Sequence, residues 1–129
     1  MKIEHVALQV AEPAAMADWY VRHLGCTIAR SGSEPLSVRF LKDGSGASML
    51  ELYRNPRVAV PDYAQMDPML VHVAFVTDDP AADRDRLVAA GATIVEDLNI
   101  TPAGDQIMML RDPWGVALQL VKRKEPMIR

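Results

Sequence analysis

Hydrophobic and polar residues follow the same order twice along this chain. Apolar and β-branched residues dominate 3–10 and again 69–77, with neither Gly nor Pro inside, which predicts a strand in each stretch. Apolar side chains then recur at spacings of three and four, and this pattern predicts a helix that begins at Pro13 and a second that runs from Pro80 to Ala90. Gly25 stands where the first helix is expected to end, as a left-handed C-terminal residue would.

The rest of each half predicts three further strands separated by turn-forming residues. The expected strands cover 26–30, 36–41 and 47–54 in the first half, and 92–95, 106–110 and 116–121 in the second. Turns are expected at 31–35, 42–46 and 112–115, and a loop at 96–105. Each half therefore predicts the order βαβββ.

The two halves are also similar residue by residue. His5 to Pro13 is repeated with small changes by His72 to Pro80, an offset of 67 positions. A repeat of this length predicts two copies of one supersecondary unit. We expect a single α+β domain over 1–129, built from tandem βαβββ modules. Its expected parts are module one 1–54, a linker 55–68, module two 69–122 and a tail 123–129.

Composition and charge narrow the class of protein. Half of the 129 residues are hydrophobic and 24% are charged, as in an ordinary globular domain. The net charge of −3, with basic residues scattered, argues against a general nucleic-acid binder. No apolar run approaches the ~20 residues that span a membrane, and no signal peptide is recognisable, so a cytoplasmic location is expected. The single Cys26 excludes an intrachain disulfide and suits a small buried residue.

Four polar positions could carry chemistry. Applying the repeat offset to Glu51 leads to Leu118 or Gln119, and strand alternation selects Gln119. The halves then supply matched pairs, His5 with Glu51 and His72 with Gln119. If the first and last strands of each half are neighbours, all four side chains can meet on one face. This N/O donor set suits one divalent ion of Zn, Ni, Co, Mn or Fe.

Five stretches together resemble the vicinal oxygen chelate superfamily, which includes glyoxalase I, bleomycin-resistance proteins and extradiol dioxygenases; the small glyoxalase I branch is the most similar. They are His5–Val10 (HVALQV), Trp19–Gly25 (WYVRHLG), Glu51–Asn55 (ELYRN), His72–Val76 (HVAFV) and Asp112–Leu120 (DPWGVALQL). The resemblance implies a mixed β-sheet that forms a cleft, with helices outside and strands one and four of each module adjacent. It also implies a homodimer and metal ligands at His5, Glu51, His72 and Gln119.

Two departures from the family pattern affect the expected substrate. The last ligand is often Glu, and Gln119 can coordinate but cannot act as a base. Gln9 stands where a basic residue would anchor glutathione, although Asn55 does match an anchoring position. Whether the protein uses glutathione or another thiol therefore stays open. The expected substrate-binding residues are Gln9, Tyr53, Asn55, Met108 and Trp114.

The favoured hypothesis is a metal-dependent lyase or isomerase of the glyoxalase type. Its small-molecule substrate would bind the ion through vicinal oxygens and react through an enediolate, with Glu51 moving the proton. One alternative is a binding protein that sequesters an antibiotic without catalysis. Another is an extradiol-type dioxygenase, whose carboxylate would be expected at the position of Gln119. The ordinary alternative for each single residue is a structural or exposed role, which we favour for His23.

Overall fold

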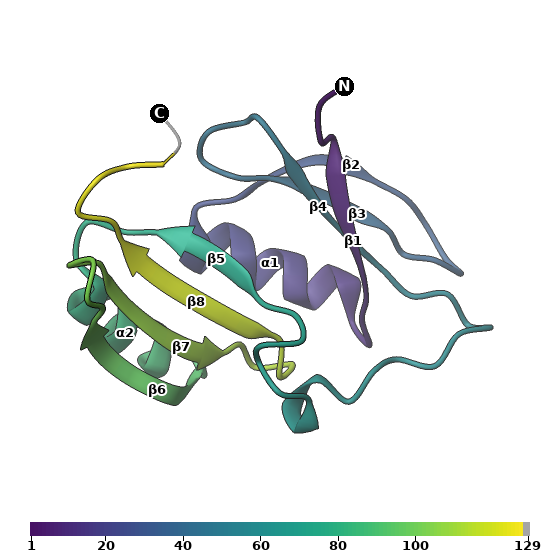
Figure 1. Cartoon of the computed structure of the whole chain (residues 1–129). Coiled ribbons are helices and arrows are strands. Elements are labelled where there is room, and N and C mark those ends of the chain that lie inside the picture. The colour runs from purple at the N-terminus through teal and green to yellow at the C-terminus, as the bar shows by residue number, and fades with distance from the viewer. Residues whose placement is uncertain (128–129) are drawn as a thin grey trace. The chain divides into compact units, whose positions relative to one another are not determined.

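The structure is a computed structural model that describes residues 1–127. Residues 128–129, the end of the expected tail, lie outside the described residues. The chain forms two compact units, Met1–Pro61 and Asp62–Arg129. Each unit contains one four-stranded mixed sheet and one α-helix (Figure 1). The predicted α+β fold of tandem βαβββ modules is confirmed.

The first unit is built around the sheet β1-β4-β3-β2. Its elements are β1 (His5–Gln9), α1 (Pro13–Leu24), β2 (Thr27–Ser31), β3 (Arg39–Lys42) and β4 (Met49–Tyr53). Strand β1 runs parallel to β4, and the other neighbours are antiparallel. Helix α1 begins at Pro13 and ends before Gly25, whose φ of 69° is left-handed, as the sequence predicts.

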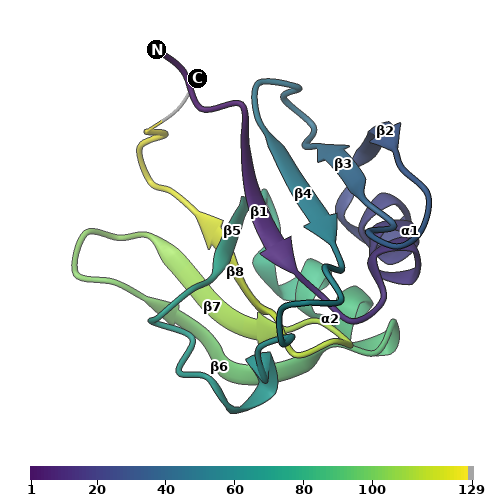
Figure 2. The same cartoon turned by 90° about the vertical axis from the view of Figure 1, so that its right-hand side faces the viewer.

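The second unit repeats this layout in the sheet β5-β8-β7-β6. Its elements are β5 (Val73–Val76), α2 (Pro80–Ala89), β6 (Thr93–Ile100), β7 (Gln106–Arg111) and β8 (Ala117–Lys122). Helix α2 lies against this sheet (Figures 1 and 2) and buries Leu87 completely. Asp79 is its N-cap, and its carboxylate accepts a hydrogen bond of 3.0 Å from the amide of Ala82.

The first and last strands of each unit are parallel neighbours, as the family resemblance implies. In the first unit Ala7 pairs with Glu51. In the second unit Ala74 pairs with Gln119. Glu51 and Gln119 therefore occupy equivalent register positions in the two sheets.

Three element boundaries differ from the predictions by three residues or more. Strand β6 continues to Ile100 through the first half of the expected loop 96–105, with register shifts on both sides of Glu96. Strand β3 begins at Arg39 because 34–37 form a turn in which Ser37 has a positive φ. Strand β5 begins at Val73, which leaves His72 immediately before the strand.

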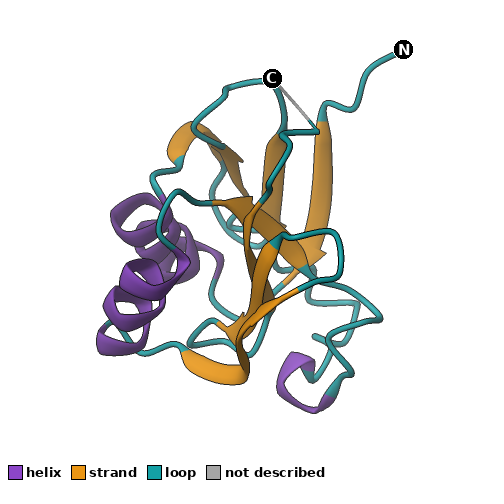
Figure 3. Ribbon diagram, turned by 60° about the vertical axis from the view of Figure 1, so that its left-hand side comes forward, coloured by secondary structure: helices purple, strands orange, loops and turns teal. Residues whose placement is uncertain are grey.

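The segment between β4 and β5 is irregular apart from one short turn. Figure 3 shows it as loop except for the 3₁₀ turn η1 (Tyr63–Gln65). Tyr63 is buried, and the rest of η1 is exposed. Among the described residues, no helix is long and apolar enough to cross a membrane.

Candidate functional site

The first unit brings His5 and Glu51 together on one face of its sheet. The parallel register places Glu51 beside Ala7, two residues along β1 from His5. The Nε2 atom of His5 lies 3.3 Å from Oε2 of Glu51. Both side chains are partly buried, with 33% of His5 and 22% of Glu51 exposed. This pair is accessible to a small molecule or ion.

The His5 ring is held from its other side. Its Nδ1 lies 2.9 Å from a carboxylate oxygen of Glu4, and a carboxylate oxygen can only accept a hydrogen bond. The ring also meets Phe40 edge-on, with centroids 5.5 Å apart and an interplanar angle of 84°. These contacts fix the ring with Nδ1 protonated and Nε2 directed at Glu51.

This geometry suits a cation between the two atoms. When Nδ1 carries the proton of a neutral imidazole, Nε2 presents a lone pair. A lone pair facing a carboxylate oxygen is unfavourable unless a proton or a cation lies between them. Two metal bonds of ~2.0–2.2 Å that meet at ~90–110° span about 2.8–3.6 Å, and the observed separation falls in this range.

The second unit fixes His72 with a backbone group instead of a carboxylate. Nδ1 of His72 lies 2.9 Å from the carbonyl oxygen of Pro68. Because a carbonyl can only accept, Nδ1 donates and Nε2 is the lone-pair nitrogen of the neutral ring. Gln119 lies on the neighbouring strand β8, where it pairs with Ala74 of β5. The donor types in this half are one imidazole and one amide oxygen.

Matching rows of residues cross the two sheets. Phe40 and Ala7 flank Glu51 in the first unit. In the second unit, Met109 and Ala74 flank Gln119. Directly paired residues of neighbouring strands share a face. Phe40 and Met109 are therefore equivalent neighbours of the two predicted ligands.

No complete metal centre is identified within the described part of the chain. In residues 1–127, no group of three or more His, Cys, Asp or Glu side chains could hold a metal ion. The predicted set draws one pair from each unit and includes the amide of Gln119. The four-ligand centre therefore stays a prediction.

Gln9 and Asn55, two of the predicted substrate-binding residues, are hydrogen-bonded to each other. The Gln9 amide nitrogen donates to the carbonyls of Asn55 and Val58, each at 2.8 Å, and its oxygen accepts from the Asn55 amide at 2.8 Å. The side chain of Asn55 accepts from the amide of Arg57 at 3.0 Å. Gln9 is only 7% exposed, so both residues hold the segment after β4 in place.

The other predicted substrate-binding residues have mixed positions. Tyr53 is half-buried and pairs with Gln9, which places it on the face of β4 that carries Glu51. Trp114 is half-buried in the turn before β8. Met108 pairs with Leu120, whereas Met109 pairs with Gln119. Met109 rather than Met108 therefore shares the face of Gln119.

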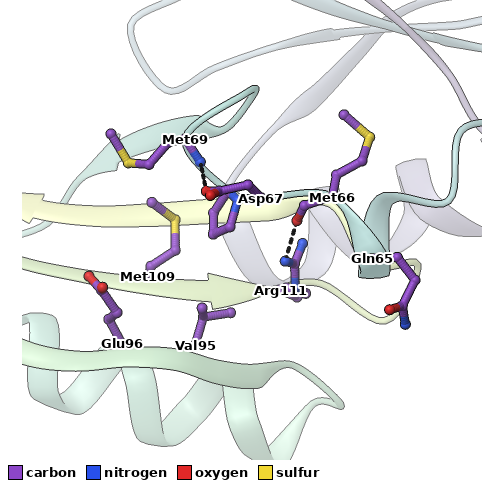
Figure 4. A pocket seen from close by; sticks show the side chains of 9 residues that line it. Gln65, Met66, Asp67, Met69, Val95, Glu96, Met109 and Arg111 are labelled. Carbon is purple, nitrogen blue, oxygen red and sulfur yellow. Dashed lines mark hydrogen bonds between the residues drawn. The ribbon is translucent and has the colours of Figure 1, made fainter.

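A cavity of about 380 Å³ lies in the second unit. The segment 65–69 lines one side of it, and Val95 and Glu96 of β6 with Met109 and Arg111 of β7 line the other. Figure 4 shows these four side chains directed from the sheet toward the loop. The strand pairing shifts register on both sides of Glu96, and irregularities of this kind re-aim side chains next to functional sites.

The charged groups of this cavity differ in how they are engaged. The Arg111 guanidinium donates to the carbonyls of Tyr63, Gly115 and Met66 at 2.7, 3.0 and 2.6 Å. Within residues 1–127 the carboxylate of Glu96 has no hydrogen-bond or ion-pair partner. Glu96 is therefore available to a cationic group of a ligand.

Cys26 takes no part in the site. The residue lies immediately before β2 and is 4% exposed. Burial, and secondarily the negative charge of Asp43, raises the pKa of its thiol to about 11. A thiol with this pKa is neutral near pH 7 and a poor nucleophile, which agrees with the predicted buried role.

Three neighbours of the predicted ligands were not predicted from sequence. Glu4 is adjacent to His5, Phe40 lies on a strand whose start was misplaced, and Met109 was not distinguished from Met108. Strand alternation is the signal that could have found Phe40 and Met109. It tells which face of the sheet a side chain occupies only after the pairing of the strand is known.

The chain belongs to the superfamily that these features indicate. The sequence profile of the Glyoxalase/Bleomycin resistance protein/Dioxygenase superfamily matches residues 2–120. No curated protein matches the chain.

Several solved structures share the fold. SMU.1112c is 27% identical, with 95% of this chain and 98% of that chain covered and a TM-score of 0.74. TioX from Micromonospora sp. ML1 is 22% identical, with 95% and 99% covered and a TM-score of 0.69. TnmS3, an antibiotic binding protein from Streptomyces sp. CB03234, is 19% identical, with 96% and 97% covered and a TM-score of 0.71.

Proposed function

We propose that this protein is a divalent-metal-dependent lyase or isomerase of the glyoxalase type. The observation that carries the proposal is the His5–Glu51 pair, whose nitrogen and oxygen face each other at 3.3 Å. Both predicted histidine ligands engage Nδ1 with an outer oxygen, which is how metal-ligating histidines are usually oriented. His5, Glu51, His72 and Gln119 would hold the ion.

The chemistry follows from this donor set. A bound Zn, Ni, Co, Mn or Fe ion would act as a Lewis acid on a substrate with vicinal oxygens. Glu51 is the only carboxylate among the four, so it is the group that can take a proton from one carbon and return it to the next. Gln119 cannot act as a base, and proton transfer is therefore expected on the Glu51 side only.

The first experiment measures metal content and turnover together. Protein purified without chelator is analysed for bound metal and assayed with α-keto hemithioacetals of several thiols and with acyl-CoA epimers. Glu51→Gln should abolish turnover while metal is largely retained, because the amide can coordinate but cannot accept the proton. The exposed Glu125→Gln is the matched control and should stay active. Full activity in Glu51→Gln would contradict the assignment.

A second candidate function is binding of a small molecule without catalysis. The cavity in the second unit supports it, because methionines and Val95 form its apolar wall and the Glu96 carboxylate has no hydrogen-bond or ion-pair partner among residues 1–127. Methionine side chains adapt to ligands of irregular shape. The structural similarity to TnmS3, an antibiotic binding protein, points in the same direction. The expected ligand has an apolar or aromatic body and a cationic group.

Calorimetry on metal-free protein tests this second candidate. Aromatic cationic drugs are titrated into the wild type, Glu96→Gln and the control Glu125→Gln. A binding protein should retain affinity without metal and should lose it selectively in Glu96→Gln. Binding that requires added metal, or no binding at all, would favour the enzyme.

The homodimer implied by the family resemblance and the cytoplasmic location expected from the sequence also remain proposals. Light scattering coupled to gel filtration measures the first, and fractionation of the producing cells measures the second. A monomer at micromolar concentration would contradict the dimer.

A further inference from the structure

We propose that Arg111 is a positioning residue for His72, and that it acts through the loop 63–68. Arg111 is the last residue of β7 and is half-buried. Its guanidinium donates to the carbonyls of Tyr63 and Met66 across a sequence separation of more than 40 residues. Hydrogen bonds to a charged donor are the stronger kind in proteins. Arg111 therefore ties this loop to the sheet.

The tied loop leads directly to the histidine. Its next residues form a closed turn, in which the Asp67 side chain accepts from the Met69 amide at 2.9 Å and its carbonyl accepts from the Leu70 amide at 3.0 Å. The carbonyl of Pro68, inside this turn, accepts from Nδ1 of His72 at 2.9 Å. The position of that carbonyl thus depends on the loop that Arg111 holds, and Figure 4 shows the hydrogen bond from Arg111 to Met66 in this loop.

A separate contact fixes the same loop from the turn before β8. Gly115 has a φ of +89°, and a Cβ built on it would lie 2.7 Å from the amide nitrogen of Ala64. Its carbonyl also accepts from Arg111 at 3.0 Å. Loop and turn therefore fit closely only when this position is glycine.

The first unit has no arginine at the position equivalent to Arg111, so this tie between loop and sheet does not follow from the duplication alone. The position equivalent to Arg111 in the first unit is Lys42. Lys42 pairs with Met49 as Arg111 pairs with Ala117. His5 is held by the side chain of Glu4, of which 71% is exposed. The second unit replaces an exposed carboxylate by a backbone carbonyl on a tethered loop.

The consequence is a defined tautomer for His72. Donation from Nδ1 to a fixed carbonyl keeps the proton on Nδ1 and the lone pair on Nε2. The role of Nε2 as a ligand rests on the proposed function, but the tautomer does not, because it requires no metal.

The test is nitrogen NMR of the histidine rings in metal-free, full-length protein. The His72 resonances are assigned by their loss in His72→Gln. Wild type should show His72 with the proton on Nδ1. Arg111→Met and Arg111→Lys should shift His72 toward a mixture of tautomers. Arg123→Met is the matched control, because it removes a half-buried arginine of the same unit that pairs with Asp105, and it should leave His72 unchanged.

Gly115→Ala supplies a second, independent way to displace the loop. It should change the His72 tautomer as Arg111→Met does, with the amide spectrum confirming a folded chain. An unchanged His72 signal in a folded Arg111→Met, Arg111→Lys or Gly115→Ala protein would overturn the proposal. If all three variants fail to fold while Arg123→Met folds, the role of Arg111 is structural and the proposal is also overturned.

A Ni²⁺ titration of the same samples separates this proposal from the proposed function. Loss of an outer partner of a metal-binding histidine typically weakens metal binding about 10–100-fold, and we expect a loss of this size in Arg111→Met. If the wild type binds no Ni²⁺ but the tautomer changes in the variants, the metal proposal fails and the role of Arg111 stands. If the wild type binds Ni²⁺ but the tautomer does not change in the variants, the proposed role of Arg111 fails and the metal proposal stands.

Discussion

At the scale of single residues, Gln9 shows how a polar side chain can be buried without cost. Its amide makes three hydrogen bonds to backbone groups of Asn55 and Val58. Buried polar groups are stable only when they are paired in this way. Gln9 thereby anchors the segment that leaves β4, and its predicted substrate contact stays a prediction.

Replacing Gln9 tests this role. Gln9→Leu leaves the Asn55 amide and two carbonyls without their partner, and an unsatisfied buried group costs about 1–3 kcal/mol. We expect the free energy of unfolding to fall by about 2 kcal/mol in urea denaturation. The exposed Gln65→Leu serves as the control and should stay within ~0.5 kcal/mol of wild type. Normal stability of Gln9→Leu combined with weaker substrate binding would instead support the substrate contact predicted from the sequence.

Strand alternation explains which residue positions could be predicted. Glu51 and Gln119 could be matched because the repeat identified the strand and the period of two identified the face. The same rule could not choose between Met108 and Met109. Their faces follow from the pairing of β7 with β8, which depends on the conformation of the intervening turn.

At the scale of elements, the helices were predicted better than the strands. Both helices begin at the predicted proline, α1 ends before Gly25, and α2 ends within one residue of its predicted end, because capping residues are local signals. Strand β6 extends into the expected loop as far as Ile100. Register shifts on both sides of Glu96 accommodate this polar segment while it stays paired with β7. That pairing is a tertiary effect, and the local sequence carries little sign of it.

The N-cap of α2 permits a prediction at this scale. Asp79→Ala removes the acceptor for the Ala82 amide at the first turn, and loss of an N-cap typically costs about 1 kcal/mol. Thermal unfolding followed by circular dichroism should show the corresponding decrease in midpoint. Asp78→Ala, at the neighbouring exposed position, is the control and should be nearly neutral. Equal effects of the two substitutions would mean that the cap contributes nothing specific.

At the scale of the whole molecule, the duplicated fold carries two unlike half-sites. The first unit offers an imidazole and a carboxylate, the second an imidazole and an amide. In the first half, the nitrogen and oxygen of this donor pair lie 3.3 Å apart. Whether a cation uses one half or both determines which substitutions remove its binding, so stability in the presence of metal is the informative quantity.

A ligand that binds only the folded state stabilises it by about 2.7 kcal/mol at a free concentration of 100 times its Kd. For a chain of this length we expect Ni²⁺ or Zn²⁺ at that excess to raise the unfolding midpoint by about 10 °C, reversed by chelator. If one ion uses both halves, His5→Ala and His72→Ala should each remove most of the increase, and the double variant should lose no more. An increase that survives His72→Ala but not His5→Ala would instead limit the ion to the pair of His5 and Glu51.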